Sequence, residues 1–439
     1  MKHLQILLPC AVILLLLSGC GYRAPLLKSY IPDITDSSRF AGIRGDYMEL
    51  AALLSKDTGL DPTGGNTLGL LPDRLRKREL LLDDLDKASE SVLLDYYRFV
   101  SDTVGTEIMD ILSRKASTGK EVAVILDRGA HTRKWMTGHR PMPEAGVELY
   151  YFYFPITPLD YLWLPKGTNR DHRKIVITDG TTAYAGGRNI QDKYFSGWHD
   201  CDIRITGPAT AHFTTVFNEN LLRVNPSRKP VAAKPDSLLR TAAAKDSIPG
   251  LRQFYDKTVQ VVPDTPTDKR NPVRNCFLWS IWNAKRYFWF YNPYTPPPVQ
   301  VLDALKDAAA RGVDVRWIAP SVNDVILEKW MAESLYESLL KAGIRIYEWQ
   351  GEILHAKMFV TDDYLTAIGS ANMDNLSFFM NLEVETIVYD EELTCYTADI
   401  YREDIEANCR EITLEEVRRW SFFRKLRNWL TKAIGGHLG

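Results

Sequence analysis

The feature that most constrains this chain is a spaced set of polar residues that occurs twice. The first copy is HRKIVITDGTTAYAGGRN, from His172 to Asn189, and the second is HAKMFVTDDYLTAIGSAN, from His355 to Asn372. Each copy has Lys at +2, Asp at +7 and Asn at +17, which gives His172, Lys174, Asp179, Asn189, His355, Lys357, Asp362 and Asn372. A single copy could arise by chance, but two copies at the same offsets indicate a duplicated domain that kept its polar residues.

The pattern around each copy extends the repeat into an α/β fold. In the first half, SVLLDYYRF (91–99) reads as a strand, and residues 103–127 read as a helix, a Gly turn and a second strand. In the second half, RYFWFYNPY (286–294) and residues 299–320 have the same order. The sequence therefore predicts two tandem α/β sandwich domains related by a pseudo-two-fold axis, each with a parallel or mixed sheet covered on both faces.

Composition shifts along the 439 residues suggest six segments. Residues 1–19 are expected to be a signal, 20–65 a tether and entry segment, and 66–227 the first domain. Residues 228–272, rich in Pro, Lys and Asp, are expected to be a linker, and 273–410 the second domain. Residues 411–439 form a basic and amphipathic segment, for which both a helix on a membrane surface and a helix docked on the domain are open.

The first twenty residues predict export and lipidation. The apolar run from Leu4 to Leu17 is shorter than the roughly 18–20 residues that span a bilayer. It ends in Leu-Ser-Gly-Cys, which resembles the lipobox of bacterial lipoproteins, cut before a cysteine that is then acylated. We expect Cys20 to anchor the protein at the periplasmic face of a membrane, inner or outer; a plain secretory signal and an uncleaved anchor are the alternatives. Pairing of the other cysteines stays open.

The repeated set has the chemistry needed to act on a phosphodiester. Residues i and i+2 of a strand share a face, so the His and Lys of each copy point the same way. Two lysines and two asparagines can hold phosphate oxygens and stabilise developing charge. One histidine can attack phosphorus while the other protonates the leaving oxygen. Neither copy suffices alone, so the two domains should face each other; no metal-ligand spacing is present, and we expect no metal and no cofactor.

These motifs resemble the HxKx₄D and GG/GSxN signature of the phospholipase D superfamily, and the surrounding segments are similar to bacterial cardiolipin synthases over about residues 66–410. The resemblance implies a phosphatidyl-histidine intermediate on His172, with His355 as general acid and then base. It implies phosphate binding by both lysines and both asparagines, with Asp179 and Asp362 as supports. Acids that orient the histidines are expected eleven residues after each asparagine, at Asp200 and Glu383, with Asp202 and Glu385 as competitors.

The function that this resemblance implies is a membrane-tethered phosphatidyltransferase that makes cardiolipin from phosphatidylglycerol. Hydrolysis to phosphatidic acid is the alternative, because water and an alcohol use the same base; an exported nuclease and a non-catalytic lipid-binding protein are disfavoured. Leu376 stands where the family commonly has Arg, which leaves the substrate open. The net charge of −2 argues against nucleic acid, so phospholipids and a membrane are the expected partners of a monomer. Tyr161 and Trp163 are candidates for a lipid-facing rim.

Overall fold

The computed structural model describes residues 37–131, 133–152, 169–266, 269–294 and 296–435. The first half of the chain contains η2 (Ser37–Phe40), η3 (Gly45–Tyr47), α2 (Met48–Thr58), β1 (Thr63–Leu71), α3 (Arg74–Lys87), β2 (Ser91–Tyr96), α4 (Thr103–Ser117), β3 (Glu121–Asp127), η4 (Arg128–Ala130), α5 (Arg133–Gly138), α6 (Pro141–Glu144), β4 (Glu148–Phe152), β5 (Lys174–Thr178), β6 (Thr182–Gly186), α7 (Asp192–Ser196), β7 (Asp202–Thr206) and α8 (Ala209–Val224).

The second half repeats this order with an extension at its end. Its elements are α9 (Asp236–Lys245), β8 (Gln253–Asp264), α10 (Pro272–Asn283), β9 (Tyr287–Tyr291), α11 (Val299–Ala310), β10 (Asp314–Pro320), α12 (Ile326–Lys341), β11 (Arg345–Trp349), β12 (Met358–Thr361), β13 (Leu365–Gly369), α13 (Asn375–Phe379), β14 (Glu383–Tyr389), α14 (Glu391–Asn408), β15 (Cys409–Ile412), α15 (Leu414–Arg419) and α16 (Phe422–Gly435).

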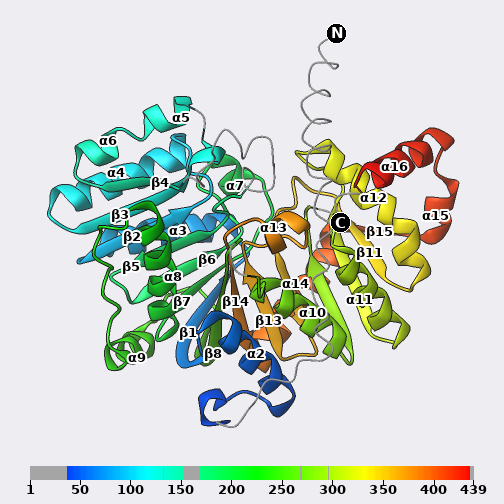
Figure 1. Cartoon of the computed structure of the whole chain (residues 1–439), viewed down its shortest axis with the longest axis horizontal. Helices are drawn as coiled ribbons and strands as arrows, with labels where there is room; N and C mark the ends of the chain where they lie inside the picture. The colour runs from blue at the N-terminus through cyan, green and yellow to red at the C-terminus, as the bar shows by residue number, and fades with distance from the viewer. Residues whose placement is uncertain (1–36, 132, 153–168, 267–268, 295, 436–439) are drawn as a thin grey trace.

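The strands join into one mixed sheet that runs through both halves, with helices on both faces (Figure 1). Its 15 strands follow the order β15-β11-β10-β9-β12-β13-β14-β8-β1-β7-β6-β5-β2-β3-β4. The central strands β8 and β1 pair antiparallel. Counted outward from this pair, the two sides of the sheet have equivalent strands in the same order, and β15 is an additional strand at one edge. Among the described strands, β2-β3-β4 and β9-β10-β11 pair in parallel, and the other neighbouring strands pair antiparallel. The predicted pair of α/β domains with pseudo-two-fold symmetry is confirmed.

Each half begins with a helix that packs on the other half. Helix α2 contacts α10 and β8, so Leu50 and Leu54 belong to the core of the second half. Helix α9 contacts β1 and β7 of the first half. The region expected to be a linker, 228–272, thus contains α9 and the central strand β8, and the expected entry segment contains α2. These exchanged helices and the β1–β8 pair make the two halves one continuous body.

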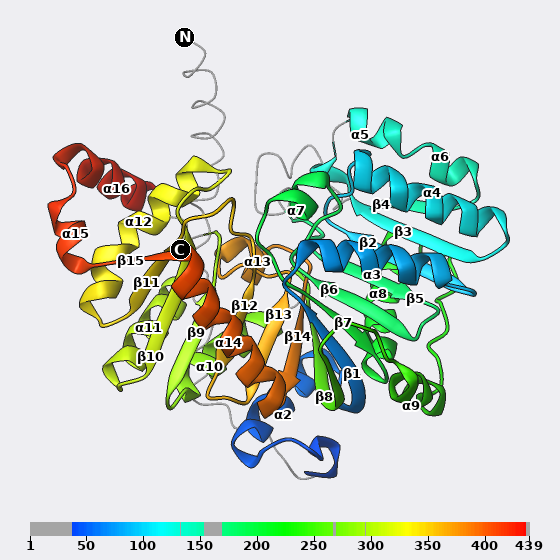
Figure 2. The same ribbon diagram turned by 180° about the vertical axis from the view of Figure 1, so that it is seen from behind.

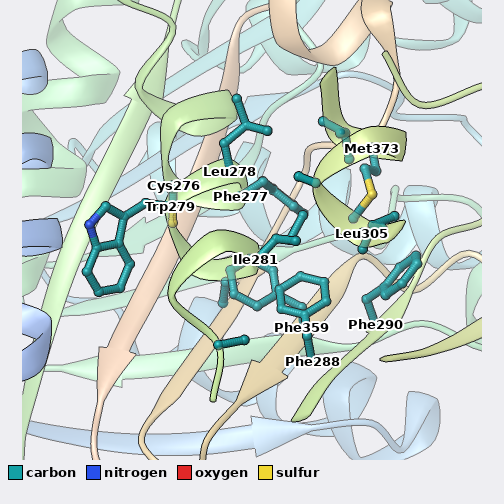
Figure 3. Close-up of a cluster of buried hydrophobic side chains, with 14 of the residues drawn as sticks. Cys276, Phe277, Leu278, Trp279, Ile281, Phe288, Phe290, Leu305, Phe359 and Met373 are labelled. Carbon is teal, nitrogen blue, oxygen red and sulfur yellow. The ribbon is translucent and has the colours of Figure 1, made fainter. Parts of the chain in front are cut away.

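The core consists of apolar layers on both faces of the sheet. Figure 3 shows part of the layer in the second half, where α10 and α11 cover the strands and Phe277, Phe288 and Phe359 pack together. The aromatic-rich stretch 278–294 lies in α10 and β9 and is largely buried, as expected for core residues. No helix in the described ranges is long and apolar enough to cross a bilayer.

Candidate active site

The two histidines of the repeated set stand directly before equivalent strands, and each is attached to the opposite half. His172 precedes β5 and His355 precedes β12, and both are buried. The backbone N–H of His172 donates to the carbonyl of Leu382 at 2.9 Å, and that of His355 donates to the carbonyl of His199 at 2.7 Å. Both bonds cross the pseudo-two-fold axis, so the loops that carry the histidines meet at the boundary between the halves.

These crossed backbone bonds bring each histidine to a carboxylate of the other half. Nδ1 of His172 lies 3.0 Å from Glu383 Oε1, and Nδ1 of His355 lies 2.6 Å from Asp200 Oδ2. Both carboxylates are fully buried. A carboxylate on Nδ1 fixes the tautomer of the ring and stabilises its imidazolium form. Because Nδ1 is occupied in both rings, Nε2 is the nitrogen that each can use for chemistry.

The structure distinguishes Asp200 and Glu383 from the acids two residues later. Asp202 forms an ion pair with Arg188 at 2.6 Å. Glu385 accepts from the backbone N–H of Ala371 at 2.9 Å, and burial raises the pKa of its carboxyl well above the usual value. Neither of these acids has a hydrogen bond to a histidine ring among the described contacts.

Both lysines of the set lie beside their histidines without exposure to solvent. Nζ of Lys174 donates to the carbonyl of His172, and Nζ of Lys357 donates to that of His355 and also lies 3.0 Å from its Nδ1. Burial lowers the pKa of Lys174 to about 7 and that of Lys357 to about 8, although the carboxylates of Glu383 and Asp200 oppose the shift. An anionic group bound beside the lysines would raise the pKa of both and favour their charged forms.

The two histidine–carboxylate pairs differ in their electrostatics. Burial opposes ionisation of Glu383, but His172, Lys174 and the hydroxyl of Ser370 together lower its pKa to about 2. Burial raises the pKa of Asp200 despite the nearby Lys357 and Arg188. The pKa of both histidines is lowered, first by burial and then by lysines of both motifs, and His355 is shifted well below its usual value. These mutual effects place the four groups in one cluster.

The asparagines and aspartates of the set take different positions. Asn189 and Asn372 are buried, and the side-chain Oδ1 of each has no hydrogen-bond partner among the described residues. Asp179 instead follows the far end of β5, roughly 20 Å along the strand from His172 at about 3.3 Å per residue. It accepts from the backbone N–H groups of residues 89–91, and Asp362 does the same for residues 285–287.

These contacts decide what the two aspartates can do. Each fastens the start of the neighbouring strand, β2 or β9, to the motif strand, and the structure does not bring Asp179 or Asp362 to the histidines. The motif pattern alone groups Asp179 and Asp362 with the catalytic histidines and lysines. Their geometry supports the role of structural supports, in agreement with the tight turns that their positive φ of 52° creates.

Several neighbours of the histidines were not singled out from the sequence. The ring of Tyr97 contacts that of His172 edge-on, with 4.7 Å between the ring centroids. The ring of Tyr294 contacts that of His355 in the same way, with 5.8 Å between the centroids. Tyr194 and Trp198 also contact His355. Their place in the repeat could have indicated them, since Tyr97 follows β2 and Tyr294 follows the equivalent strand β9.

The sequence pattern also did not indicate which side chains hold the Glu383 carboxylate. Ser370 Oγ donates to its Oε2, and Asn381 Nδ2 donates to its Oε1 at 3.2 Å. Ser370 is the second residue of the Gly-Ser pair, and the first repeat has Gly187 at this place. Only Glu383 therefore has a hydroxyl partner at this position, which contributes to its lowered pKa.

The remaining expectations from the sequence concern residues outside this site. Cys20, Tyr161 and Trp163 fall outside the described residues. Cys201, Cys276, Cys395 and Cys409 are free thiols. Within the described ranges, no group of three His, Cys, Asp or Glu side chains is arranged to hold a metal ion.

Comparison with known proteins matches both halves of the chain to one domain family. The domain family described as "Cardiolipin synthase, PLD-like domain" matches residues 81–221 and 278–405. Cardiolipin synthase 1 of Bacillus anthracis is 30% identical over 86% of this chain and 72% of its own length. The major cardiolipin synthase of Bacillus subtilis is 31% identical over 89% of this chain and 79% of its own length.

A solved structure shares the fold at much lower identity. The phosphatidylserine synthase of Haemophilus influenzae superposes with a TM-score of 0.62 at 14% identity and covers 84% of this chain and 94% of its own. Each of the two matched domains contains a motif histidine, a motif lysine and a carboxylate that contacts the histidine of the other half, and these groups form one candidate site. The chain belongs to the phospholipase D superfamily of enzymes, within the group that resembles cardiolipin synthases.

Proposed function

We propose that this protein is a phosphatidyltransferase that makes cardiolipin from phosphatidylglycerol, with a second phospholipid as donor or acceptor. The observation that carries the proposal is the pair of crossed contacts, His172–Glu383 and His355–Asp200, beside two buried lysines. The names of the relatives support the same activity. A tether through acylated Cys20 at the periplasmic face belongs to this proposal and is supported by the Leu-Ser-Gly-Cys sequence.

In the first step, the phosphodiester of phosphatidylglycerol lies between Lys174, Lys357 and the two asparagines. Nε2 of His172 attacks phosphorus, since its Nδ1 is held by Glu383. A P–N bond forms, the P–O bond to the head group breaks, and His355 gives its Nε2 proton to the departing glycerol oxygen. The Glu383 carboxylate stabilises the positive charge that remains on the phosphorylated imidazole ring.

In the second step, neutral His355 removes the proton from a hydroxyl of the second phosphatidylglycerol. That oxygen attacks phosphorus, the P–N bond breaks, and cardiolipin leaves with His172 neutral again. Water in the same position would give phosphatidic acid. The lipid hydroxyl and water compete for one base, so the ratio of cardiolipin to phosphatidic acid shows which acceptor reaches His355.

The test is a product analysis with purified protein. Phosphatidylglycerol, with and without phosphatidylethanolamine, is incubated with the native chain and with His172→Ala, and the lipids are identified by mass spectrometry. We expect cardiolipin with release of glycerol, or of ethanolamine where phosphatidylethanolamine is the donor, and neither product with His172→Ala. Phosphatidic acid as the sole product would replace the proposal with a hydrolytic phospholipase D.

A further inference from the structure

Helix α16 packs on the protein with its polar side inward. It lies against α12, and there Asn428 and Thr431 are buried. Its aromatic side chains point outward, with Phe423 exposed by 80% and Trp429 by 63%. A surface helix of a globular protein ordinarily buries its apolar stripe and exposes its charged side. The orientation of α16 is the reverse of this.

An ion-pair cluster fixes this reversed orientation. Glu333 of α12 is buried, and Arg424 of α16 donates to both of its oxygens at 2.9 and 3.1 Å, while Arg427 also bonds to it. Cζ of Arg424 lies 3.6 Å from the centroid of the Trp420 ring, and Cζ of Arg427 lies 5.0 Å from that of the Trp330 ring. A buried carboxylate needs such partners, because leaving it unpaired is strongly destabilising. Charge pairing therefore determines which side of α16 faces the domain.

The outward side forms a continuous apolar surface, which we name the α16 face. It consists of Phe422, Phe423, Leu426, Trp429 and Leu430, all exposed. Their spacing of three, four and seven residues places them in one stripe of the helix. A contiguous exposed patch of large apolar side chains on a soluble surface marks an interaction site.

The α16 face rests on a helix whose preceding loop contacts the candidate active site. Helix α12, on which α16 rests, begins at Ile326, which is exposed together with Val322 and Val325. Asp324, within this loop, accepts a hydrogen bond at 2.8 Å from Tyr294, whose ring contacts His355. In Figures 1 and 2, α16 and α7 lie in the upper part of the molecule, and α13 lies between them, nearer the middle.

The charges around the α16 face indicate what covers it. Residues 414–435 contain six lysines and arginines but only two acidic residues, Glu415 and Glu416. Arg418, Arg419 and Lys425 are exposed beside the apolar stripe. Aromatic side chains flanked by cations are the composition of a helix that lies in the interface of an anionic bilayer.

We propose that the α16 face, together with Val322, Val325 and Ile326, binds the surface of a bilayer that contains anionic phospholipid. Ion pairs hold α16 to the domain while its apolar side enters the head-group region, so the domain is oriented with its histidine loops toward the lipid. This orientation serves catalysis only if the substrate is a membrane lipid, and that part rests on the proposed function. The contact itself adds to any anchor at Cys20, because it fixes how the domain faces the membrane.

A position-specific probe tests the contact in the full chain. Trp429→Cys is labelled with an environment-sensitive fluorophore, and Leu238→Cys is the matched control, since Leu238 is an exposed leucine on α9, at the opposite, lower side of the molecule (Figure 1). Both are mixed with vesicles of phosphatidylcholine alone or with an equal part of phosphatidylglycerol, and the signal of the parent cysteines is subtracted. We expect a blue shift and quenching by brominated acyl chains at position 429 with phosphatidylglycerol, and no response at 238.

Equal responses at 429 and 238 would overturn the proposal. A response at 429 that depends on protein concentration and needs no lipid would also overturn it, since a second copy of the chain would then cover the face. Quenching by acyl chains is specific for insertion, so it separates the membrane from a protein partner.

An activity comparison separates this inference from the proposed function. The double variant Phe423→Glu with Trp429→Glu should lose activity on phosphatidylglycerol vesicles by on the order of tenfold or more, because two large apolar side chains no longer enter the lipid and no longer orient the domain. It should keep native activity on phosphatidylglycerol dispersed in detergent, as should Leu238→Glu on both substrates. Full vesicle activity of the double variant would contradict the inference. Absence of product with the native chain in detergent would contradict the proposed function alone, and the fluorescence result would still stand.

Discussion

Nδ1 of His172 lies 3.0 Å from Oε1 of Glu383, although 211 positions separate the two residues in the chain. The reciprocal contact joins His355 to Asp200 across 155 positions. Each half therefore contains one motif histidine and one carboxylate that contacts the histidine of the other half. A single domain of this kind would hold a histidine without its carboxylate, which gives a physical reason for the duplication.

The first prediction concerns Glu383. Glu383→Gln keeps the shape of the side chain but removes the charge that stabilises a cationic His172 ring, so kcat should fall by about 10²–10⁴-fold. Glu385→Gln is the matched control, because Glu385 is equally buried, lies two residues away and accepts from the backbone N–H of Ala371 instead of contacting His172. Lipid turnover by both variants is compared with thermal unfolding of both.

The control decides how the result is interpreted. If Glu385→Gln loses as much activity as Glu383→Gln while both stay folded, the contact with His172 is not what matters. If Glu383→Gln alone loses activity, and the accumulated intermediate at His172 falls with it, the carboxylate acts through the ring that it contacts.

The second prediction concerns pH. Burial lowers the pKa of Lys174 to about 7 and that of Lys357 to about 8, and each lysine is charged below its pKa. Affinity for the anionic substrate should therefore fall as the pH rises through about 7–8, and kcat/KM should fall with it. Lys174→Arg carries a charge that is not lost in this range, so the alkaline limb of its kcat/KM profile should shift upward even if kcat is lower. An unchanged limb in this variant would assign the titration to another group.

Local pattern was sufficient to predict the repeating units. Residues 91–127 and 286–320 were expected as strand, helix and strand, and they form β2, α4 and β3, and β9, α11 and β10. Their apolar periodicity is determined by neighbours within a few residues and is visible without tertiary structure. The same holds for the turns at Asp179 and Asp362, which the Asp-Gly and Asp-Asp pairs indicate.

Long-range pairing was less accessible to sequence reasoning. Strand β8 lies in the centre of the sheet, but its last residues belong to the stretch 261–272, whose Pro, Lys and Asp content is typical of a linker. Residues 253–259 of this strand pair with β1, and residues 258–264 pair with β14, so it is long-range pairing that places β8 in the sheet. The choice of Asp200 over Asp202 likewise depends on a backbone bond from the opposite half, between His355 and His199. The orientation of α16 depends on one buried residue of α12, Glu333.

The third prediction concerns metal ions. Lys174 and Lys357 supply the positive field at the phosphodiester, so lipid turnover should persist after treatment with EDTA and gel filtration. Turnover is measured in the same preparation before chelation and after it, with added Mg²⁺ as a control. Complete loss that only a divalent ion restores would mean that the lysines are not sufficient for phosphate binding.

The fourth prediction concerns the anchor. Cys20→Ser should abolish incorporation of labelled palmitate and leave the protein uncleaved or released from the membrane, because acylation needs the thiol. Labelling that survives the substitution would exclude Cys20 as the acylated residue. Cys409→Ser is a suitable control, because this half-buried free thiol should not affect acylation.

The last prediction concerns the division of labour between the histidines. His172→Ala removes the attacking nitrogen, so no phospho-enzyme should form with any substrate. His355→Ala removes only the proton for the leaving oxygen, a contribution of about 10²–10⁴-fold. A nitrophenyl phosphodiester has a leaving group that needs no proton, so His355→Ala should cleave it far better than a natural lipid, relative to the native enzyme, and should accumulate phosphohistidine at position 172.

The substrates are compared by initial rates, and the intermediate is identified by mass spectrometry of the digested protein. If His172→Ala retains activity on the nitrophenyl ester while His355→Ala has none, the two roles are exchanged, and Asp200 would then support the nucleophile. The lower pKa of His355 makes this comparison informative, since a ring that is neutral at rest is competent to attack but must gain a proton before it can act as an acid. Near-native lipid turnover by both single variants would show that neither histidine is the nucleophile.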